Sequence, residues 1–206
     1  MGIGPSSDSK RGSDPVRLAY ADPPYPGRAH LYADHPDYAG EVDHEELIAR
    51  LRTDYAGWAL STNAESLHWL LPMCPEVRVL AWTKHTVAVS WEPVLVYSAR
   101  RVSHVTGPRD WIFVEPEAFQ YRPKPDSYVI GQKPEAFCRW LFLWLGAEPG
   151  EDTLDDLFPG SGAVGRAWDR WNEQPSLLSV PSERAKRRMA ARLIAAHPSL
   201  EGYEPV

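Results

Sequence analysis

The sequence is poor in cysteine and has no long apolar run. Its two cysteines, Cys74 and Cys138, each lie in an apolar stretch, which favours a buried, unreactive thiol over a disulfide or a metal ligand. No stretch approaches the roughly 18 to 20 apolar residues of a membrane-spanning helix, and residues 1–14 hold no apolar segment typical of a secretion signal. We therefore expect a cytoplasmic protein that is neither disulfide-rich, a zinc ribbon nor a membrane protein.

Positive charge is also scarce, because 22 Lys and Arg stand against 28 Asp and Glu, a formal charge of -6. This balance argues against a non-specific nucleic-acid coat but allows a local basic patch. Two residue types are abundant instead, with 20 prolines and 9 tryptophans in 206 residues. The proline share is about twice the usual ~5 %. Prolines at this frequency divide a chain into short elements.

The chain divides into three parts. Residues 1–15 are rich in Gly, Ser and Pro without large apolar side chains, so we expect a flexible tail. Residues 16–182 are expected to form one domain, because the chain as a whole has 43 % apolar residues from which to build a core. Residues 183–206 are expected to be a basic helix, Glu183–Ala196, and a tail.

Strands and helices alternate along the domain. Short apolar runs predict strands at Arg17–Ala21, Gly57–Ser61, Val77–Trp82, Pro93–Ser98, Thr153–Leu157 and Ser176–Val180. Helical spacing, caps and stops predict helices from Asp43 to about Arg52 and at Ala64–Leu71, Pro134–Leu145 and Ala163–Trp171. The alternation predicts an α/β fold, with a mostly parallel sheet covered by helices on both faces.

The first group that could perform chemistry is the turn Asp22-Pro23-Pro24-Tyr25, which directly follows the predicted strand Arg17–Ala21. In α/β folds, ligands bind at the carboxyl ends of strands. Two consecutive prolines fix the backbone and hold the carboxylate and the aromatic ring in one rigid turn. Such a turn suits an exocyclic amine that donates both hydrogens while its ring stacks on an aromatic face. An ordinary strand-ending turn is the alternative interpretation.

Two further segments have related features. Asp156-Leu157-Phe158-Pro159-Gly160-Ser161-Gly162 follows a predicted strand and precedes a helix, and its glycines would let a ligand approach the backbone. It lacks the Lys-Ser/Thr of a P-loop and the complete GxGxxG of a dinucleotide fold. Gly131-Gln132-Lys133-Pro134 opens the predicted helix that ends at Leu145.

Taken in order, these motifs resemble those of the circularly permuted S-adenosylmethionine-dependent methyltransferases that modify amino groups of DNA bases. In that family a DPPY-type motif precedes an FxGxG cofactor motif, with a KP-type motif just upstream of the latter. The resemblance covers about Leu18 to Asn172 and includes the WEPVLVY segment, residues 91–97. It implies a single Rossmann-like methyltransferase domain.

The resemblance also implies roles for individual residues. Asp22, Pro23, Pro24 and Tyr25 would form the catalytic turn, which receives a base that is flipped out of its helix. The cofactor S-adenosylmethionine would contact Lys133, Asp156, Phe158, Pro159, Gly160, Ser161, Gly162 and Asn172. The implied reaction is methylation of the N6 amine of adenine in DNA.

Two departures from the family pattern leave alternatives open. Residues 99–123 are too short for a sizeable target-recognition region, so specificity would be short or absent. The brevity of the chain and its KPE…DLF…W…N pattern are also similar to the family that methylates adenosine in messenger RNA, although that family has Trp where this chain has Tyr25. RNA adenosine, the N4 amine of cytosine, a homodimer and a non-catalytic partner subunit therefore remain alternatives.

The short insert is both basic and aromatic. Nucleic-acid contacts are expected from Arg100, Arg101, Arg109 and Trp111, because an aromatic and basic loop beside a base pocket can hold single strands or splayed duplexes. The seven histidines show no metal-ligand spacing. For His30, His35 and His44, which follow the DPPY turn, we expect substrate-loop or surface roles and no metal site.

Overall fold

The computed structural model describes residues 14–33, 40–84, 90–103, 107–116 and 132–173. The predicted strand Ser176–Val180, the predicted helix Glu183–Ala196 and residues 1–13 of the predicted tail lie outside the described residues, as does His35. Within the described ranges, no helix combines the length and the apolar character needed to cross a membrane.

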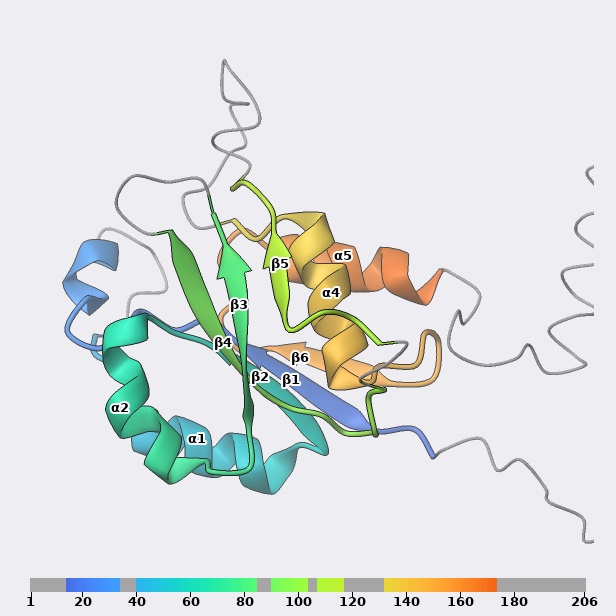
Figure 1. Cartoon of the computed structure of the whole chain (residues 1–206), viewed down its shortest axis with the longest axis horizontal. Helices are drawn as coiled ribbons and strands as arrows, with labels where there is room; N and C mark the ends of the chain where they lie inside the picture. Colours follow the sequence, from blue (N-terminus) through green and yellow to red (C-terminus); the bar gives the residue numbers. More distant parts are fainter. Residues whose placement is uncertain (1–13, 34–39, 85–89, 104–106, 117–131, 174–206) are drawn as a thin grey trace, which may run out of the picture.

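Among the described residues, six strands form one twisted sheet in the order β5-β3-β4-β2-β1-β6 (Figure 1). They are β1 (Arg17–Ala21), β2 (Gly57–Ser61), β3 (Arg78–Thr83), β4 (Trp91–Tyr97), β5 (Trp111–Phe113) and β6 (Thr153–Asp156). Strand β4 is antiparallel to both of its neighbours, and the three other pairings are parallel. Five of the six strands therefore end at one edge of the sheet, which we call the carboxyl edge.

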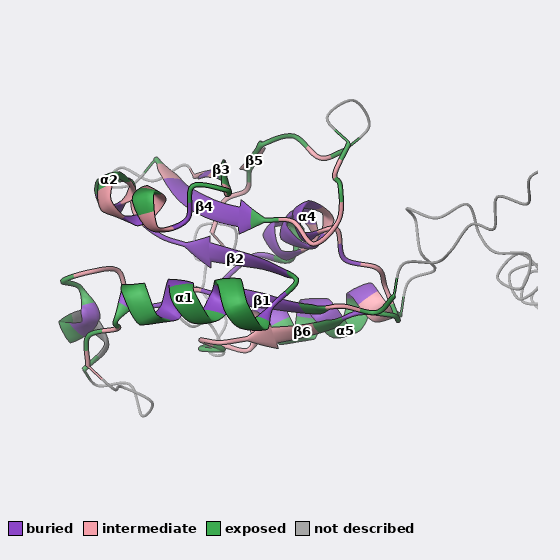
Figure 2. Cartoon of the chain, turned by 90° about the horizontal axis from the view of Figure 1, so that it is seen from below, coloured by how far each residue is buried: buried purple, intermediate pink, exposed green. Residues whose placement is uncertain are grey.

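Helices cover both faces of the sheet, as Figures 1 and 2 show. One face carries α1 (His44–Asp54) and α2 (Leu67–Leu70), the latter between the 3-10 turns η2 (Ala64–Ser66) and η3 (Leu71–Met73). The opposite face carries α4 (Glu135–Leu145) and α5 (Ala163–Asn172), while a further 3-10 turn, η1, spans Ala29–Tyr32. The predicted α/β class, with a mostly parallel sheet between two helical layers, is confirmed.

The two faces of β1 contribute to separate cores. Leu18 and Tyr20 pack into the core on the α4 and α5 side, whereas Ala19 and Ala21 pack into the core on the α1 and α2 side. This alternation follows from the two-residue repeat of a strand. Helix α4 buries seven side chains, Phe137, Cys138, Trp140, Leu141, Phe142, Trp144 and Leu145. Each large apolar side chain buried in this way contributes about 1.5–3 kcal/mol, so α4 is firmly fixed on the sheet.

Local signals set the helix ends. The Asp43 side chain accepts a hydrogen bond of 3.0 Å from the Glu46 N–H at the start of α1, as a capping residue does. Pro134, predicted as the first helical residue of α4, lies instead at its N-cap, one position before the first helical residue, Glu135. Gly146 ends α4 with φ 70, a left-handed conformation that glycine adopts without steric cost.

Strand β5 corrects the prediction that residues 99–123 form a loop. Trp111, Ile112 and Phe113 pair in parallel with β3 at the edge of the sheet. The Ile112 side chain packs against the α4-side core, while Trp111 and Phe113 are 46% and 52% exposed. Three residues are too few for a recognisable alternation, which is why the sequence did not indicate this strand.

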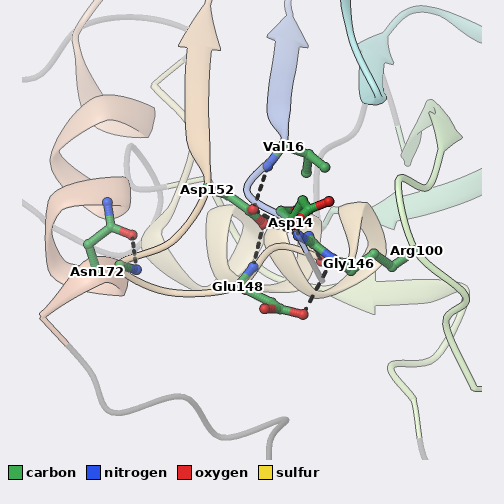
Figure 3. Close-up of polar contacts among 8 residues, drawn as sticks. Asp14, Val16, Arg100, Gly146, Glu148, Asp152 and Asn172 are labelled. Atoms are coloured by element: carbon green, nitrogen blue, oxygen red, sulfur yellow. Dashed lines mark hydrogen bonds and ion pairs between the residues drawn. The ribbon is translucent and has the colours of Figure 1, made fainter. Parts of the chain in front are cut away.

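A buried ion pair fixes the opposite edge of the sheet, where β1 and β6 begin (Figure 3). The Arg100 guanidinium donates to both carboxylate oxygens of Asp152 at 2.6 and 2.9 Å, and to the Gly146 carbonyl at 2.9 Å. The Asp152 carboxylate also accepts from the N–H groups of Val16, at 3.0 Å, and Glu148, at 2.8 Å. Burial alone would raise the pKa of Asp152, but these hydrogen bonds lower it below its usual value.

Arg100→Met is expected to lower the free energy of unfolding by about 3–5 kcal/mol, because it leaves a fully buried carboxylate without its cation. The matched control is Arg101→Met, since Arg101 is exposed and adjacent; it should stay within about 0.5 kcal/mol of wild type. The folded-state pKa of Asp152 is depressed. The contribution of the Arg100–Asp152 pair to the free energy of unfolding is therefore present above the unfolded-state pKa of about 4, and it is lost as the pH falls below that value. Urea unfolding at pH 7 and in acid checks this, and equal effects at Arg100 and Arg101 would contradict it.

Candidate active site

Two turns leave the sheet side by side at its carboxyl edge. Strand β1 leads into Asp22-Pro23-Pro24-Tyr25, and its parallel neighbour β6 leads into the glycine-rich turn. Tyr20 lies opposite Asp156 in the register of the pair, and the Leu157 N–H donates to the Tyr20 carbonyl at 2.9 Å. Two motifs that are far apart in the sequence therefore lie side by side.

The glycine-rich turn is tight and its backbone is accessible. Gly160 and Gly162 have φ values of 46 and 71, and the Gly162 N–H donates to the Pro159 carbonyl at 2.7 Å. Among the described residues, a Cβ placed at Gly160 would meet only the Phe158 carbonyl, at 3.9 Å. The described part of the chain therefore leaves the space over Gly160 open. Both glycines are needed for the backbone conformation, and Gly160 also leaves room for a ligand.

Asp156 stands at the base of this turn with a buried oxygen that lacks a partner. Among the described residues, no hydrogen bond reaches its Oδ1 atom. Burial raises the pKa of Asp156 to about 6, although a hydrogen bond from the Phe158 N–H lowers it. The negative charge of Asp22 adds to the rise. A buried acceptor without a donor is costly, so this oxygen is suited to receive a hydrogen bond from a ligand.

A row of four alternating charges extends from Asp22 into the protein, and we call it the buried charge chain: Asp22, Lys133, Glu92 and Lys84. The Lys133 Nζ lies 2.8 Å from Asp22 Oδ2 and 3.0 Å from Glu92 Oε1, and Glu92 Oε2 accepts from Lys84 Nζ. The side chains of Lys133 and Glu92 are each 7% exposed, whereas Asp22 is 24% exposed. Asp22 is therefore the end of the buried charge chain that solvent or a substrate can reach.

The topology explains how these charges meet. Asp22 follows β1 and Lys84 follows β3, so both lie at the carboxyl edge. Glu92 lies near the start of β4, and because β4 is antiparallel to the other strands its amino end reaches the same edge. Lys133 directly precedes the cap of α4, on the face of the sheet that carries α4 and α5. The Trp82 ring lies beneath the two ammonium groups, with Nζ of Lys84 at 3.9 Å and Nζ of Lys133 at 5.2 Å from its centroid.

The pKa values follow from this arrangement. Burial raises the pKa of Asp22, with Lys133 opposing the rise and Glu92 adding to it. Burial would lower the pKa of Lys133, but the two carboxylates beside it outweigh burial and raise it. For Glu92, burial would raise the pKa and the two lysines lower it below its usual value. Burial lowers the pKa of Lys84. The two lysines therefore favour the ionised form of Glu92, and the two carboxylates favour the ionised form of Lys133.

A small cavity of about 180 Å³ opens between the amino ends of α4 and α5, and its lining includes Lys133. The other lining residues are Gln132, Glu135, Ala163, Arg166 and Arg170. The Arg166 side chain donates to the Ser161 carbonyl at 2.9 Å, which ties the cavity to the glycine-rich turn. Arg170 pairs with Glu135 at 3.0 Å. The cavity is polar and mainly basic, so it is suited to a negatively charged group.

Most of the predicted cofactor residues lie together here, but Asn172 does not. Lys133, Asp156 and the segment from Phe158 to Gly162 surround the carboxyl edge. Helix α5 runs back across the sheet from this edge, so its last residue, Asn172, lies at the opposite edge (Figure 3). There the Asn172 Oδ1 accepts from the Gly150 N–H at 3.0 Å. The structure thus places Asn172 away from the other residues expected to contact the cofactor.

The basic insert is also placed differently from the prediction. Arg100 and Arg101 follow the carboxyl end of the antiparallel strand β4, and Arg109 and Trp111 lie at the amino end of β5. All four are at the edge opposite Asp22. Arg100 pairs with Asp152, and the Arg109 guanidinium lies 5.6 Å from the Trp111 ring centroid. The expected position beside the base pocket is wrong; contact of these residues with nucleic acid stays a prediction.

Glu92 and Lys84 were not predicted to belong to the site. Glu92 is the only charged residue in the otherwise apolar and aromatic WEPVLVY strand, and it is buried. A buried carboxylate requires a partner, so this position carried a detectable signal. No group of three or more His, Cys, Asp or Glu side chains within the described ranges is arranged to hold a metal ion.

The sequence matches no family model and no curated protein. Among solved structures, the chain is similar to the crystal structure of the M1.HpyAVI-SAM complex, with 15% sequence identity and a TM-score of 0.49. That match covers 77% of this chain and 80% of the other. A likeness this distant assigns no activity, so the function is inferred from the motifs and from the geometry of the site.

Proposed function

We propose that the protein is an S-adenosylmethionine-dependent methyltransferase that modifies the N6 amine of adenine in DNA. The observation that carries this proposal is the meeting of the DPPY turn and the glycine-rich turn on neighbouring parallel strands, β1 and β6. A methyltransferase needs a donor site and an acceptor site in contact, and the two turns supply one each. The order of the motifs in the chain agrees with the permuted family that they resemble.

The residues at β6 fit the cofactor. The Asp156 Oδ1, which lacks a donor, would accept a hydrogen bond from the cofactor's amino group, and the open space over Gly160 would admit the cofactor against the backbone. The basic cavity lined by Arg166 and Arg170 suits the carboxylate of its methionine part. S-adenosylmethionine would supply an activated methyl group on a sulfonium centre.

The residues at β1 fit an exocyclic amine. Asp22 and the Pro23 carbonyl would accept the two amine hydrogens, and Tyr25 would stack on a flipped base. The amine of adenine is a poor nucleophile because its lone pair is delocalised into the ring. Two fixed acceptors favour a pyramidal nitrogen whose lone pair points at the methyl group, so positioning and electrostatics supply most of the rate.

The state of Asp22 supports a catalytic protein over a non-catalytic partner subunit. A subunit that only lent its surface would have no need for a carboxylate that is 24% exposed at the end of a buried charge chain, since burying charges is unfavourable. RNA adenosine and the N4 amine of cytosine remain the alternative substrates, and a homodimer remains an alternative assembly. The following experiment separates the substrates.

The protein would be incubated with methyl-labelled S-adenosylmethionine and, separately, with a DNA pool and an RNA pool. Mass spectrometry of the digested nucleosides would then identify the product. We expect labelled N6-methyladenine in DNA. Label in N4-methylcytosine or only in RNA would redirect the proposal to those substrates, and no label in either pool, alone or in lysate, would favour the partner subunit.

A further inference from the structure

We infer that Glu92 is a positioning residue for Asp22. The carboxylates of Glu92 and Asp22 both contact the Lys133 ammonium, and Lys84 determines how strongly Glu92 attracts that ammonium. The inference rests on the proposed function, because it concerns how Asp22 is kept ready to receive an amine. It assigns roles to Glu92 and Lys84 that the sequence motifs do not.

Lys133 bridges two carboxylates at almost equal distances. Its Nζ lies 2.8 Å from Asp22 and 3.0 Å from Glu92, and the side chain is 7% exposed. A lysine ammonium has three donors on a flexible stem, so a single partner would not fix its position. Glu92 on β4 and Asp22 after β1 hold it from two strands, and the aromatic rings of Trp82 and Phe137 lie beside it.

A pair of only two charged residues would have required less free energy to bury. Asp22 and Lys133 alone already balance each other's charge, yet the protein buries Glu92 and Lys84 as well, with side chains 7% and 13% exposed. Well-packed apolar residues in place of such a pair are often neutral or stabilising. The second pair therefore contributes a property other than stability, and its contact with Lys133 indicates which one.

The contact between Glu92 and Lys133 affects how Asp22 can receive a substrate amine. If Lys133 belonged to Asp22 alone, its ammonium would compete with the substrate amine for the carboxylate. With Glu92 taking part of the ammonium, Asp22 Oδ2 stays fixed in position while the carboxylate keeps enough negative charge to accept a neutral N–H donor. Asp22 is 24% exposed, so this carboxylate can be reached from outside.

Among the described residues, the charges that face Asp22 come from four elements: Lys133 before α4, Glu92 on β4, Lys84 after β3 and Asp156 on β6. Glu92 raises the pKa of Asp22, whereas Lys133 and Lys84 lower it. Removing the charge of Glu92 would leave the Lys133 ammonium to Asp22 alone and lower the pKa of Asp22. Removing Lys84 would strengthen the attraction between Glu92 and Lys133 and raise the pKa of Asp22. The two substitutions thus have opposite signs.

The test compares Glu92→Gln with Lys84→Met in the full chain. We expect the acid limb of the kcat profile to move to lower pH in Glu92→Gln and to higher pH in Lys84→Met. The kcat of Glu92→Gln should fall by at least about tenfold at its optimum, with the cofactor Kd unchanged within about twofold. Glu76→Gln, which alters an exposed pair with Arg52, is the control and should move neither limb.

A second measurement keeps the inference independent of activity. Carbon-13 NMR titration of the Asp22 carboxyl group should show the same opposite displacements, even if no methyl transfer is detected and the proposed function fails. If Glu92→Gln does not fold, the double variant Glu92→Gln/Lys84→Met, which restores charge balance, takes its place. It should keep the kcat loss, and its Asp22 should titrate at lower pH than in Lys84→Met. Displacements of the same sign in the single variants, no displacement, or a double variant with wild-type kcat would overturn the inference.

Discussion

Asp22→Ala is expected to lower methyl transfer by at least about 10²-fold, the scale observed when one preorganised transition-state partner is removed. The cofactor Kd should stay within a few-fold of wild type, because Asp22 lies on the amine side of the site and Asp156 on the cofactor side. The fold should persist, since Lys133 keeps Glu92 as its partner at 3.0 Å. Single-turnover kinetics and calorimetric titration of the cofactor measure the two quantities separately.

Asp54→Ala provides the matched control for this substitution. Asp54 is an exposed aspartate at the end of α1, paired with Arg50 at 3.8 Å, so its removal should change neither quantity. An Asp22→Ala protein with wild-type methyl transfer would contradict the role given to Asp22. Loss of cofactor binding in the same variant would show that the two turns cannot be separated into donor and acceptor sites.

Gly160→Val is expected to abolish cofactor binding while leaving the circular dichroism spectrum nearly unchanged. The valine side chain would occupy the open space in which the cofactor approaches the backbone, where the nearest protein atom to a Cβ is 3.9 Å away. The left-handed backbone at Gly160, with φ 46, adds strain of roughly 1–2 kcal/mol, which the fold should tolerate. Calorimetry with S-adenosylmethionine measures the loss.

The chain offers a close control at Gly150. This glycine is also left-handed, with φ 75, and a Cβ there also meets its nearest atom at 3.9 Å, but it lies at the opposite edge of the sheet. Gly150→Val should therefore carry a similar strain and retain cofactor binding. Wild-type binding by a folded Gly160→Val protein, or equal loss in both variants, would contradict the assignment of the glycine-rich turn.

The sequence was sufficient where a structural signal is local. The bounds of β1 and β2 were predicted without error because each is a short apolar run between polar or turn residues. Helix α1 follows from the capping of Glu46 by Asp43, and the end of α4 follows from Gly146. The DPPY and glycine-rich turns were predicted as a site because each directly follows a strand.

The sequence was insufficient where the outcome depends on contacts between distant segments. Lys133 was expected to contact the cofactor, and no local pattern indicates that its ammonium lies between Asp22 and Glu92, which come from other elements. The antiparallel direction of β4 is what brings Glu92 to the carboxyl edge and takes Arg100 to the opposite one. Strand direction is set by the whole sheet, so neither placement is visible in the residues alone.

The most direct test of the central claim is a crystal structure of the protein with bound S-adenosylmethionine. The claim is that the two adjacent turns form one donor and acceptor site. It predicts the methionine part of the cofactor against Gly160, its amino group on Asp156 and its sulfonium methyl group facing the Asp22 carboxylate. A cofactor bound elsewhere on the chain, or one whose methyl group points away from Asp22, would contradict the claim.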